Sequence, residues 1–453
     1  MKHSVWQFLV VSSVLVASLG AETRPQYGGT VRVAMREELT SLDPADGTQA
    51  DSFARRNLTT LMFDTLVSVT ENGRLRPALA ISWQASGNQA WKIQLRRGVK
   101  FHDGSSLTAE VVAASLRTAN PSWNISAEGD AVVVDPGTAD PELLTKLALP
   151  RNAIVQRDSA NTLSGTGPFR TVDWQPGKKL TLAANEDCWR GRAFVDVLEI
   201  EMGRSYRDQI ASLDLGKADL IEVAPEQVHR ASMDGRRLAS SSPVELMALV
   251  FSREASSPDE KLLREALALS IDRNSMRSVL LQGAGQPSGG ILPTWMSGYG
   301  FVFSVDADLA KARHDREQVR AMPAWTLGYD GSDAVARLVA ERIALNARDA
   351  GLALQTSSAA TTDLRLMRIP LSSADPWIAL ADVAGMVGAP LSRKAGPVED
   401  LYATEQSLMT TQKIIPLFHL PVSYASSGAL KSWTVRPDGD WDLADAWLGS
   451  KQP

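Results

Sequence analysis

The chain of 453 residues is long enough for two or three domains with sizeable cores, and its composition is that of a soluble globular protein. Lys and Arg number 47 against 52 Asp and Glu. A net charge of −5 without a basic run makes nucleic acid and anionic membranes poor candidates as partners. The single cysteine, Cys188, excludes an intrachain disulfide and multi-cysteine zinc or iron–sulfur sites.

The N-terminal segment has the features of a secretory signal peptide. Lys2 and His3 precede a short apolar run, and the small residues Ser18 and Gly20 suit a signal peptidase. The run is short and interrupted for a membrane anchor, and no cysteine follows it that could carry a lipid. We therefore expect residues 1–20 to be removed after about Gly20, leaving a periplasmic protein without a lipid anchor.

The first half of the chain predicts mixed strands and helices. Thr108 is expected to cap one helix, with Val111 as its partner. Alternation predicts strands at 30–34 and 90–96, and further strands are expected over 131–134, 170–174, 180–185, 197–202 and 219–223, with a buried strand over 244–251. Helices are predicted over 53–67, 106–118, 141–149 and 206–215.

The second half predicts a β-α-β unit within a second α/β region. Apolar residues follow helical spacing from Asp259 to Leu281, and Gly351 closes a long predicted helix. Strands are expected over 325–327, 352–354, 364–369 and 422–425, and helices over 333–350 and 398–411. The order of these elements predicts an α/β protein whose second lobe begins near residue 250.

Catalytic and metal-binding motifs are scarce. The five histidines are widely spread, and neither a Gly-x-Ser-x-Gly elbow nor a phosphate-binding Gly-x-x-x-x-Gly-Lys loop occurs. Asp438-Gly439-Asp440 is interpreted as a turn, because the ligand pattern of a calcium loop does not continue. We therefore expect no catalytic residues, no metal site and no cofactor. The twelve tryptophans suit either pocket walls or core packing.

Ordered blocks of sequence carry a resemblance to a known family. They include Gly28–Val33, Phe63–Val67, Arg96–Gly104, Gly165–Phe169 and Trp441–Trp447, and they span nearly the whole chain after the leader. In this order the blocks resemble the family 5 extracellular solute-binding proteins of ABC importers. That family holds dipeptide-, oligopeptide- and nickel-binding proteins.

The resemblance implies a two-lobed periplasmic-binding-protein fold, similar to class II, that closes by a hinge. Residues 21–247 would form lobe I, with an extra subdomain at about 45–165. Residues 248–421 would form lobe II, and residues 422–453 would return to lobe I.

The resemblance also implies which residues edge the cleft. Asp46 and Thr48 follow the first strand, and Trp295 and Trp377 would be pocket walls, with Ser373 beside them. The family's peptide binders carry an aspartate that pairs with the ligand's α-ammonium, and this position falls on Ser372. Because a hydroxyl cannot neutralise an ammonium in a closed cleft, free-amino peptides are disfavoured as ligands.

The function implied is that of a non-catalytic, monomeric binding protein that captures a small organic or peptide-like solute and delivers it to the membrane permease of an ABC importer. The alternative, from a different class, is a solute-sensing or chaperone-like binding protein that is not coupled to transport.

Overall fold

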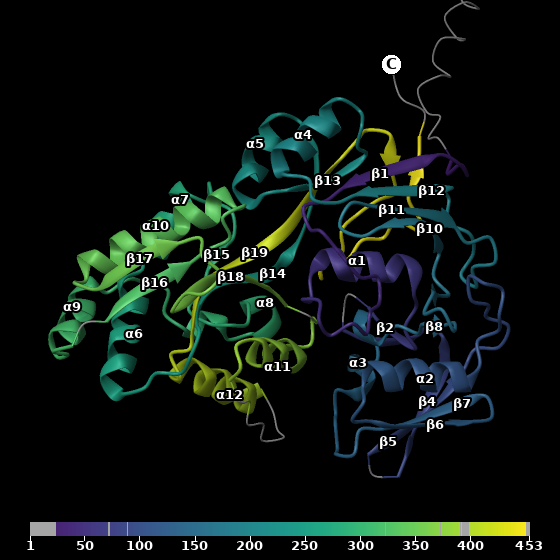
Figure 1. Ribbon diagram of the computed structural model, residues 1–453, viewed down its shortest axis with the longest axis horizontal. Helices are drawn as coiled ribbons and strands as arrows, with labels where there is room; N and C mark the ends of the chain where they lie inside the picture. The colour runs from purple at the N-terminus through teal and green to yellow at the C-terminus, as the bar shows by residue number, and fades with distance from the viewer. Residues whose placement is uncertain are drawn as a thin grey trace, which may run out of the picture.

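The computed structural model describes residues 24–70, 73–87, 89–321, 323–371, 373–389, 391 and 398–449. The expected leader over residues 1–20 and the candidate residue Ser372 lie outside the described residues. Within these ranges the chain forms two lobes joined by long shared strands, with a smaller unit below the first lobe (Figure 1).

One large sheet runs through both lobes of the described chain. It contains eleven strands in the order β10-β11-β12-β1-β13-β19-β14-β18-β16-β17, with β15 (Gln286–Pro287) paired to β19. Lobe I contributes β10 (Phe169–Gln175), β11 (Lys179–Ala184), β12 (Val197–Glu201), β1 (Thr30–Ala34) and β13 (Leu220–Val223). Lobe II contributes β18 (Leu364–Pro370), β16 (Ala324–Gly328) and β17 (Ala353–Ser357).

Two long antiparallel strands, β14 (Arg237–Phe251) and β19 (Ile414–Ser426), pass from one lobe to the other. β19 pairs with β13 of lobe I, and β14 pairs with β18 of lobe II. Their mutual register shifts on both sides of the pair Pro243–Pro421. Because neither proline has an N–H to donate, the ladder is weakest where the strands cross between the lobes.

Lobe I packs helices on the parallel strands β12, β1 and β13. Its main core joins α1 (Phe53–Met62) to strand residues such as Val31, Leu180 and Ile200, all buried. Trp441 and Leu443, near the C-terminus, belong to the same core. A second, smaller cluster of buried apolar residues forms where α4 (Tyr206–Asp214) and α5 (Val228–Met233) pack near β13.

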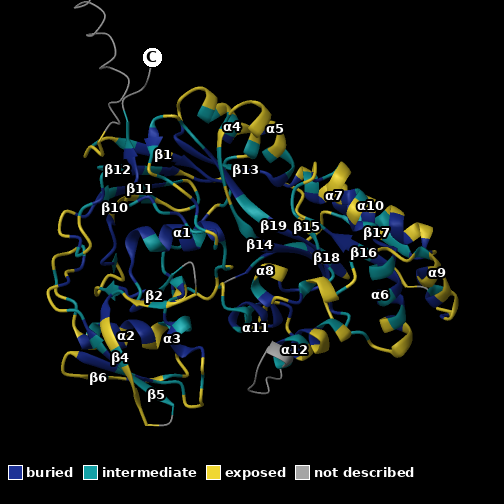
Figure 2. Ribbon diagram, turned by 180° about the vertical axis from the view of Figure 1, so that it is seen from behind, coloured by how far each residue is buried: buried dark blue, intermediate teal, exposed yellow. Residues whose placement is uncertain are grey.

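Lobe II has helices on both faces of its sheet, as Figure 1 shows. One core includes residues of α6 (Pro258–Ser270), α7 (Arg273–Val279), α9 (Leu309–Glu317) and α10 (Ala334–Asp349). The other includes residues near α8 (Thr294–Ser297) and from α11 (Pro376–Met386) and α12 (Val398–Thr410). Figure 2 shows the crossing strands largely buried and the outer surfaces of α7 and α9 exposed.

A smaller unit has its own sheet and core. Its strands follow the order β4-β5-β7-β6 and cover α2 (Ala109–Ala119), with α3 (Leu143–Lys146) close by. The strands are β4 (Ala80–Ser86), β5 (Ala90–Leu95), β6 (Asn124–Glu128) and β7 (Ala131–Asp135). Its buried core runs from Leu66 to Ile154 in sequence. This separate core makes the unit a distinct layer beside lobe I.

Short elements complete the fold. Three two-stranded pairs are β2 (Val67–Val69) with β3 (Leu75–Pro77), β8 (Gln156–Arg157) with β9 (Leu163–Ser164), and β20 (Leu430–Lys431) with β21 (Trp447–Leu448). Single 3₁₀ turns occur at Pro150–Asn152, Pro225–Gln227 and Gly300–Val302.

Four of the predicted elements need correction. The helix predicted over 53–67 ends at Met62, because Phe63 is extended and Val67 begins a strand. The single helix predicted from Asp259 is two helices, since Ile271 is extended and the Asp272 side chain caps α7. β14 begins at Arg237 and β19 at Ile414, both well before the strands predicted over 244–251 and 422–425, because each pairs with the other along its length. In addition, α11 was not predicted.

Other predictions are confirmed. Thr108 caps α2, its Oγ1 accepting from the Val111 N–H at 3.4 Å. The β-α-β unit is β16-α10-β17, whose two strands pair in parallel. These segments are set by local periodicity and capping, which the sequence carries directly.

The crossing strand β19 contains a buried histidine that couples folding to pH. His419 is 3% exposed, and its Nε2 lies 2.9 Å from the Ile291 carbonyl oxygen, which fits an Nε2–H donor. Burial lowers the pKa of His419 to about 4. Between pH 6.5 and 4 the unfolded chain therefore binds a proton at this residue that the folded chain does not.

We expect the free energy of unfolding to fall as the pH decreases through that window, with His419 contributing at most about 3 kcal/mol of the loss. Urea unfolding at several pH values across this range measures the free energy of unfolding of the wild type and of a His419 variant. His419→Gln keeps a side-chain donor and should lose less stability between pH 6.5 and 4 than the wild type. Equal losses in both proteins would contradict the assignment.

Candidate functional site

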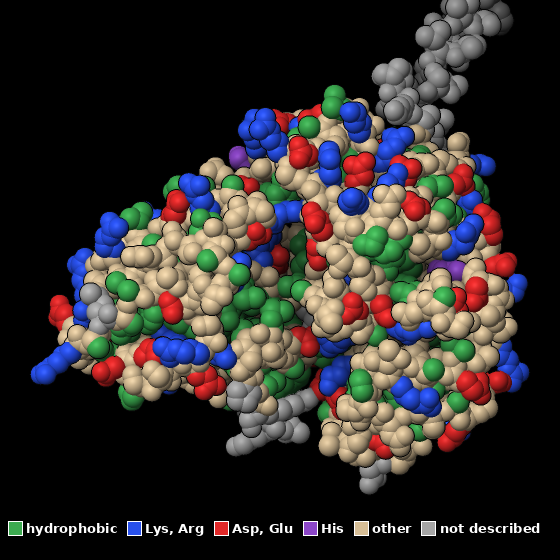
Figure 3. All heavy atoms as spheres, in the orientation of Figure 1, with side chains coloured by type: hydrophobic (Ala, Val, Ile, Leu, Met, Phe, Trp, Pro, Cys, Tyr) green, Lys and Arg blue, Asp and Glu red, His purple; other side chains and the backbone are tan. Residues whose placement is uncertain are grey.

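The larger of two cavities described here lies where the lobes meet. It has a volume of about 730 Å³ and is lined from lobe I by residues 36–38 after β1, by Tyr206 and by Glu222. Residues 330–333 after β16 and residues 365–368 of β18 line it from lobe II. Figure 3 shows the surface hollowed along this line. The cavity, called the interlobe cavity below, thus sits at the carboxyl ends of parallel strands in both lobes, the usual place for ligands in α/β sheets.

Arg36 of lobe I reaches across the interlobe cavity to lobe II. Its Nη2 lies 2.7 Å from Asp330 Oδ2 and 2.8 Å from Ser332 Oγ, and its Nη1 lies 3.8 Å from Asp333 Oδ2. Burial raises the pKa of Asp330, but hydrogen bonds from Ser332 and the charge of Arg36 outweigh burial and hold this pKa below its usual range. The two lobes are thus linked by an ion pair at the cavity wall.

A second guanidinium group, on Arg368 of β18, is held entirely on the lobe II side. Its Nη2 lies 2.5 Å from Glu245 Oε2, and its Nη1 lies 3.6 Å from Asp333 Oδ2. Burial opposes the charge, but the attraction of Glu245 is strong enough to raise the pKa of Arg368. Glu222, on β13 facing this group, accepts from the Arg36 backbone N–H at 2.6 Å, and burial raises its pKa.

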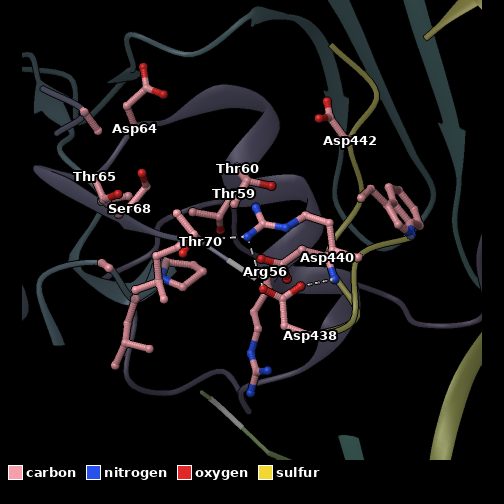
Figure 4. A pocket seen from close by; sticks show the side chains of 18 of the residues that line it. Arg56, Thr59, Thr60, Asp64, Thr65, Ser68, Thr70, Asp438, Asp440 and Asp442 are labelled. Carbon is pink, nitrogen blue, oxygen red and sulfur yellow. Dashed lines mark hydrogen bonds and ion pairs between the residues drawn. The ribbon is translucent and has the colours of Figure 1, made fainter. Parts of the chain in front are cut away.

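The second cavity, of about 320 Å³, lies beside α1. It is lined by the second half of α1, residues 64–70, the loop over residues 436–444, and Trp295 and Leu371 of lobe II. We name the 436–444 segment the return loop and the space the return-loop cavity. Figure 4 shows Asp438 and Asp440 of this loop close to Arg56, with Thr59, Thr60 and Asp64 along α1 and beyond it.

The return loop brings a buried acid into the second cavity. Burial and repulsion from Asp438 raise the pKa of Asp440 to about 7, against the opposing charges of Arg56 and Arg436. Asp438 itself lies 3.4 Å from Arg436. Between the two aspartates, Gly439 has φ +90°, and a Cβ there would meet the Phe53 ring at 2.9 Å, so the turn requires glycine.

Arg56 lines the return-loop cavity, and its partner Asp51 lines the interlobe cavity. Arg56 is 4% exposed, with Nη2 2.5 Å from Asp51 Oδ2 and Nη1 2.9 Å from the carbonyl oxygen of Leu371. Leu371 also lines the return-loop cavity. The contact with Leu371 is also a second polar link from lobe I to lobe II.

Two of the residues predicted from the sequence meet at the return-loop cavity. Trp295 is 43% exposed, and its Nε1 donates to the Pro243 carbonyl at the strand crossing, 2.9 Å away. Ser373 lines the same cavity, and its Oγ accepts from the Asp375 N–H at 3.0 Å. The structure therefore brings these two side chains together from separate segments of lobe II.

The other candidates lie elsewhere. The Asp46 carboxylate accepts hydrogen bonds from the N–H and the Oγ1 of Thr48 at 3.0 and 2.6 Å. Neither Asp46 nor Thr48 is among the described residues that line the two cavities. Trp377 opens α11, where Asp375 accepts its N–H at 2.9 Å, and its side chain packs against the core of lobe II. Ser372 lies outside the described residues.

Several lining residues were missed by reasoning from the sequence. Arg36 and Glu37 directly follow a predicted parallel strand, and that position was a usable signal for them. Arg56 gave no signal, because a charged residue within an amphipathic helix is normally solvated. Asp440 was recognised only as part of a turn.

Two features are absent from the described part of the chain. No group of three or more His, Cys, Asp or Glu side chains there is placed to hold a metal ion. No helix among those residues is both long and apolar enough to cross a bilayer.

Comparison with known proteins places these features in context. In sequence, the chain is 26% identical over 240 residues to the nickel-binding protein NikA of Staphylococcus aureus, covering 50% of this chain and 49% of that protein. It is 22% identical over 329 residues to the oligopeptide-binding protein AppA of Bacillus subtilis, covering 66% and 59%. In these alignments the chain thus spans about half of the curated relatives' length.

The fold is shared over nearly the whole chain. The crystal structure of a dipeptide binding protein from Pseudoalteromonas sp. SM9913 in complex with Met-Leu aligns with a TM-score of 0.81 at 16% identity, covering 93% of this chain and 100% of that one. The profile of bacterial extracellular solute-binding proteins, family 5 (middle region), matches residues 74–369. The chain therefore belongs to the bacterial extracellular solute-binding proteins of family 5.

Proposed function

We propose that the protein is the substrate-binding component of an ABC importer, which captures a small organic solute between its lobes and delivers it to the permease without catalysing a reaction. The observation that carries this proposal is the interlobe cavity, whose walls come from both lobes. Its volume of about 730 Å³ suits a small molecule. Relatives named for binding nickel, oligopeptides and a dipeptide support a binding role.

Capture in this proposal depends on lobe closure. Lobe I and its subdomain send three arginines to acceptors on lobe II: Arg36 to Asp330, Arg56 to the Leu371 carbonyl, and Arg151 to Asp382 at 2.8 Å. These contacts exist only when the lobes are close. A solute that touches both walls therefore favours the closed form, which the permease would recognise.

The proposed solute contacts begin with Trp295 and Ser373, which face the return-loop cavity beside the strand crossing. Asp46, Thr48, Ser372 and Trp377 stay predictions. The proposal also includes export of a monomer to the periplasm, in keeping with a family of extracellular binding proteins.

The first test is native mass spectrometry of the freshly purified protein, followed by denaturation and identification of any released small molecule. We expect a retained solute, or else a compound from a panel of peptides, sugars and opines that raises Tm. A ligand at 100 times its Kd stabilises the folded state by about 2.7 kcal/mol. A strain lacking the gene should lose import of that solute. Failure to bind any compound would overturn the proposal, and unchanged import would favour a sensing role.

The second test concerns closure. Arg36→Ala should shift the solute-free protein toward the open form, because it removes the ion pair to Asp330. Such a partly exposed pair contributes up to about 1 kcal/mol, so we expect a change of up to about five-fold in the open-to-closed ratio. Small-angle X-ray scattering at low salt would show a larger radius of gyration.

The matched control for closure is Arg97→Ala, which breaks an ion pair with Asp130 inside the subdomain. It should leave the scattering curve unchanged. Identical curves for Arg36→Ala and the wild type would show that this contact does not hold the lobes together.

The third test concerns Trp295. Its replacement by alanine removes an aromatic wall of the return-loop cavity, and we expect the affinity for the identified solute to fall about ten-fold. Phe301→Ala, which removes a nearby side chain that is 76% exposed, is the control and should bind normally. Calorimetric titration measures both, and equal affinities would remove Trp295 from the site.

A further inference from the structure

The charges around the interlobe cavity are unequally matched. Carboxylates outnumber guanidinium groups among its lining residues. On the lobe II side, Arg368 neutralises Glu245 and Arg36 neutralises Asp330. On the lobe I side, Asp51 is paired with Arg56 at 2.5 Å. Of the four lining arginines, Arg36 and Arg368 are held by these carboxylates, Arg365 donates to the backbone carbonyl of Ala359, and Arg204 lies 3.7 Å from Glu201. This leaves little positive charge for an anionic solute.

Three lining carboxylates, on Glu37, Glu38 and Glu222, form no ion pair with another residue of the described chain. Glu38 is exposed, whereas Glu222 accepts from the Arg36 backbone N–H and from the Gln209 amide. Glu37 is therefore the less satisfied of the two that are withdrawn from solvent.

Glu37 lies after β1, is half-buried, and accepts a hydrogen bond from Ser52 Oγ at 2.8 Å. Within the described chain, no Lys, Arg or His nitrogen lies within 4 Å of its carboxylate. The neighbouring cation Arg55 is used elsewhere, because its guanidinium donates to the backbone carbonyls of Gln49, Asp43, Pro44 and Asp46.

The surroundings of Glu37 make this negative charge costly. Burial raises its pKa, and the nearby carboxylates Glu222 and Asp51 add repulsion, which the Ser52 hydrogen bond and the charge of Arg55 only partly offset. A carboxylate removed from water without a counter-ion destabilises the closed form. A cation placed in the cavity by a solute would remove that cost.

We propose that the interlobe cavity selects solutes carrying an ammonium or guanidinium group, and that Glu37 receives this group. The inference rests on the proposed binding function and names its substrate class. It differs from the expectation drawn from Ser372, because it places the counter-charge for a solute cation on Glu37 instead. The rings of Phe53, Tyr206 and Tyr424 line the same cavity. They supply apolar surface for the carbon stem that carries the cation.

Matched pairs of probes test the charge alone. N-acetyl-arginine amide and N-acetyl-citrulline amide differ only in the guanidinium group, and leucinamide and N-acetyl-leucinamide differ in the terminal ammonium. Titration calorimetry on the full mature protein should give a Kd about ten-fold lower for the charged member of at least one pair. The two pairs distinguish a side-chain cation from a terminal one.

Variants then assign the preference to Glu37. Glu37→Gln should abolish the difference within the pair, whereas Glu37→Asp should keep part of it. Glu128→Gln removes one negative charge from the subdomain, outside the cavity, and should leave the difference unchanged. Glu37→Gln should also raise the Tm of the solute-free protein at neutral pH, because it removes the uncompensated charge.

Three results would overturn the inference. They are no preference for the charged probes, a preference that survives Glu37→Gln, and a solute retained from the cell that has no positive group. In the last case the binding function stands while its assigned substrate class fails. Absence of binding by any compound would instead remove the proposed function itself.

Discussion

The pairing of β14 with β19 is the constraint on which the rest of the structure depends. Both strands carry buried residues into each lobe, so neither lobe can form its sheet without them. Between the lobes, Pro243 faces Pro421 and the register shifts on either side. Rotation at this point breaks few backbone hydrogen bonds, because prolines donate none. Each lobe can therefore keep its own core while the angle between the lobes changes.

The strength of the polar contacts follows the same division. The pair between Arg56 and Asp51 lies within lobe I and is largely buried on the arginine side. The contacts from Arg36 to Asp330 and from Arg151 to Asp382 join the lobes and are partly exposed. Exposed ion pairs contribute little, whereas breaking a buried pair is costly. The ion pairs that closure forms are thus the weak ones, and its buried contact is a hydrogen bond from Arg56 to the Leu371 carbonyl.

Local order was predictable from the sequence, and spatial convergence was not. The strand at Thr30–Ala34 and the β-α-β unit around α10 follow from periodicity within single segments. The first part of β14, from Arg237, is polar and does not alternate, so only its partner β19 makes it a strand. The two-lobed arrangement was predicted only from the resemblance to a family. No local pattern could predict it, because the crossing strands lie far apart in sequence.

The same reason limits prediction of the site. Trp295 and Ser373 could be named from the resemblance, and the structure places both at one cavity. Arg36, Glu37 and Arg56 acquire their roles only from partners in distant segments. The Arg36 partner Asp330 lies in the other lobe, and the Arg56 partner Leu371 follows β18. No pattern within either segment records such pairs.

Arg56 also links the two sets of proposed solute contacts. It lines the return-loop cavity together with Trp295 and Ser373, and its partner Asp51 lines the interlobe cavity together with Glu37. The guanidinium is buried and packs over the Phe53 ring at 5.2 Å, so removing it from Asp51 would leave a buried charge without its partner. Its hydrogen bond to the Leu371 carbonyl, in contrast, joins the lobes and can be lost without breaking that pair. Arg56 therefore stays with lobe I when the lobes separate, and only its bond to lobe II depends on closure.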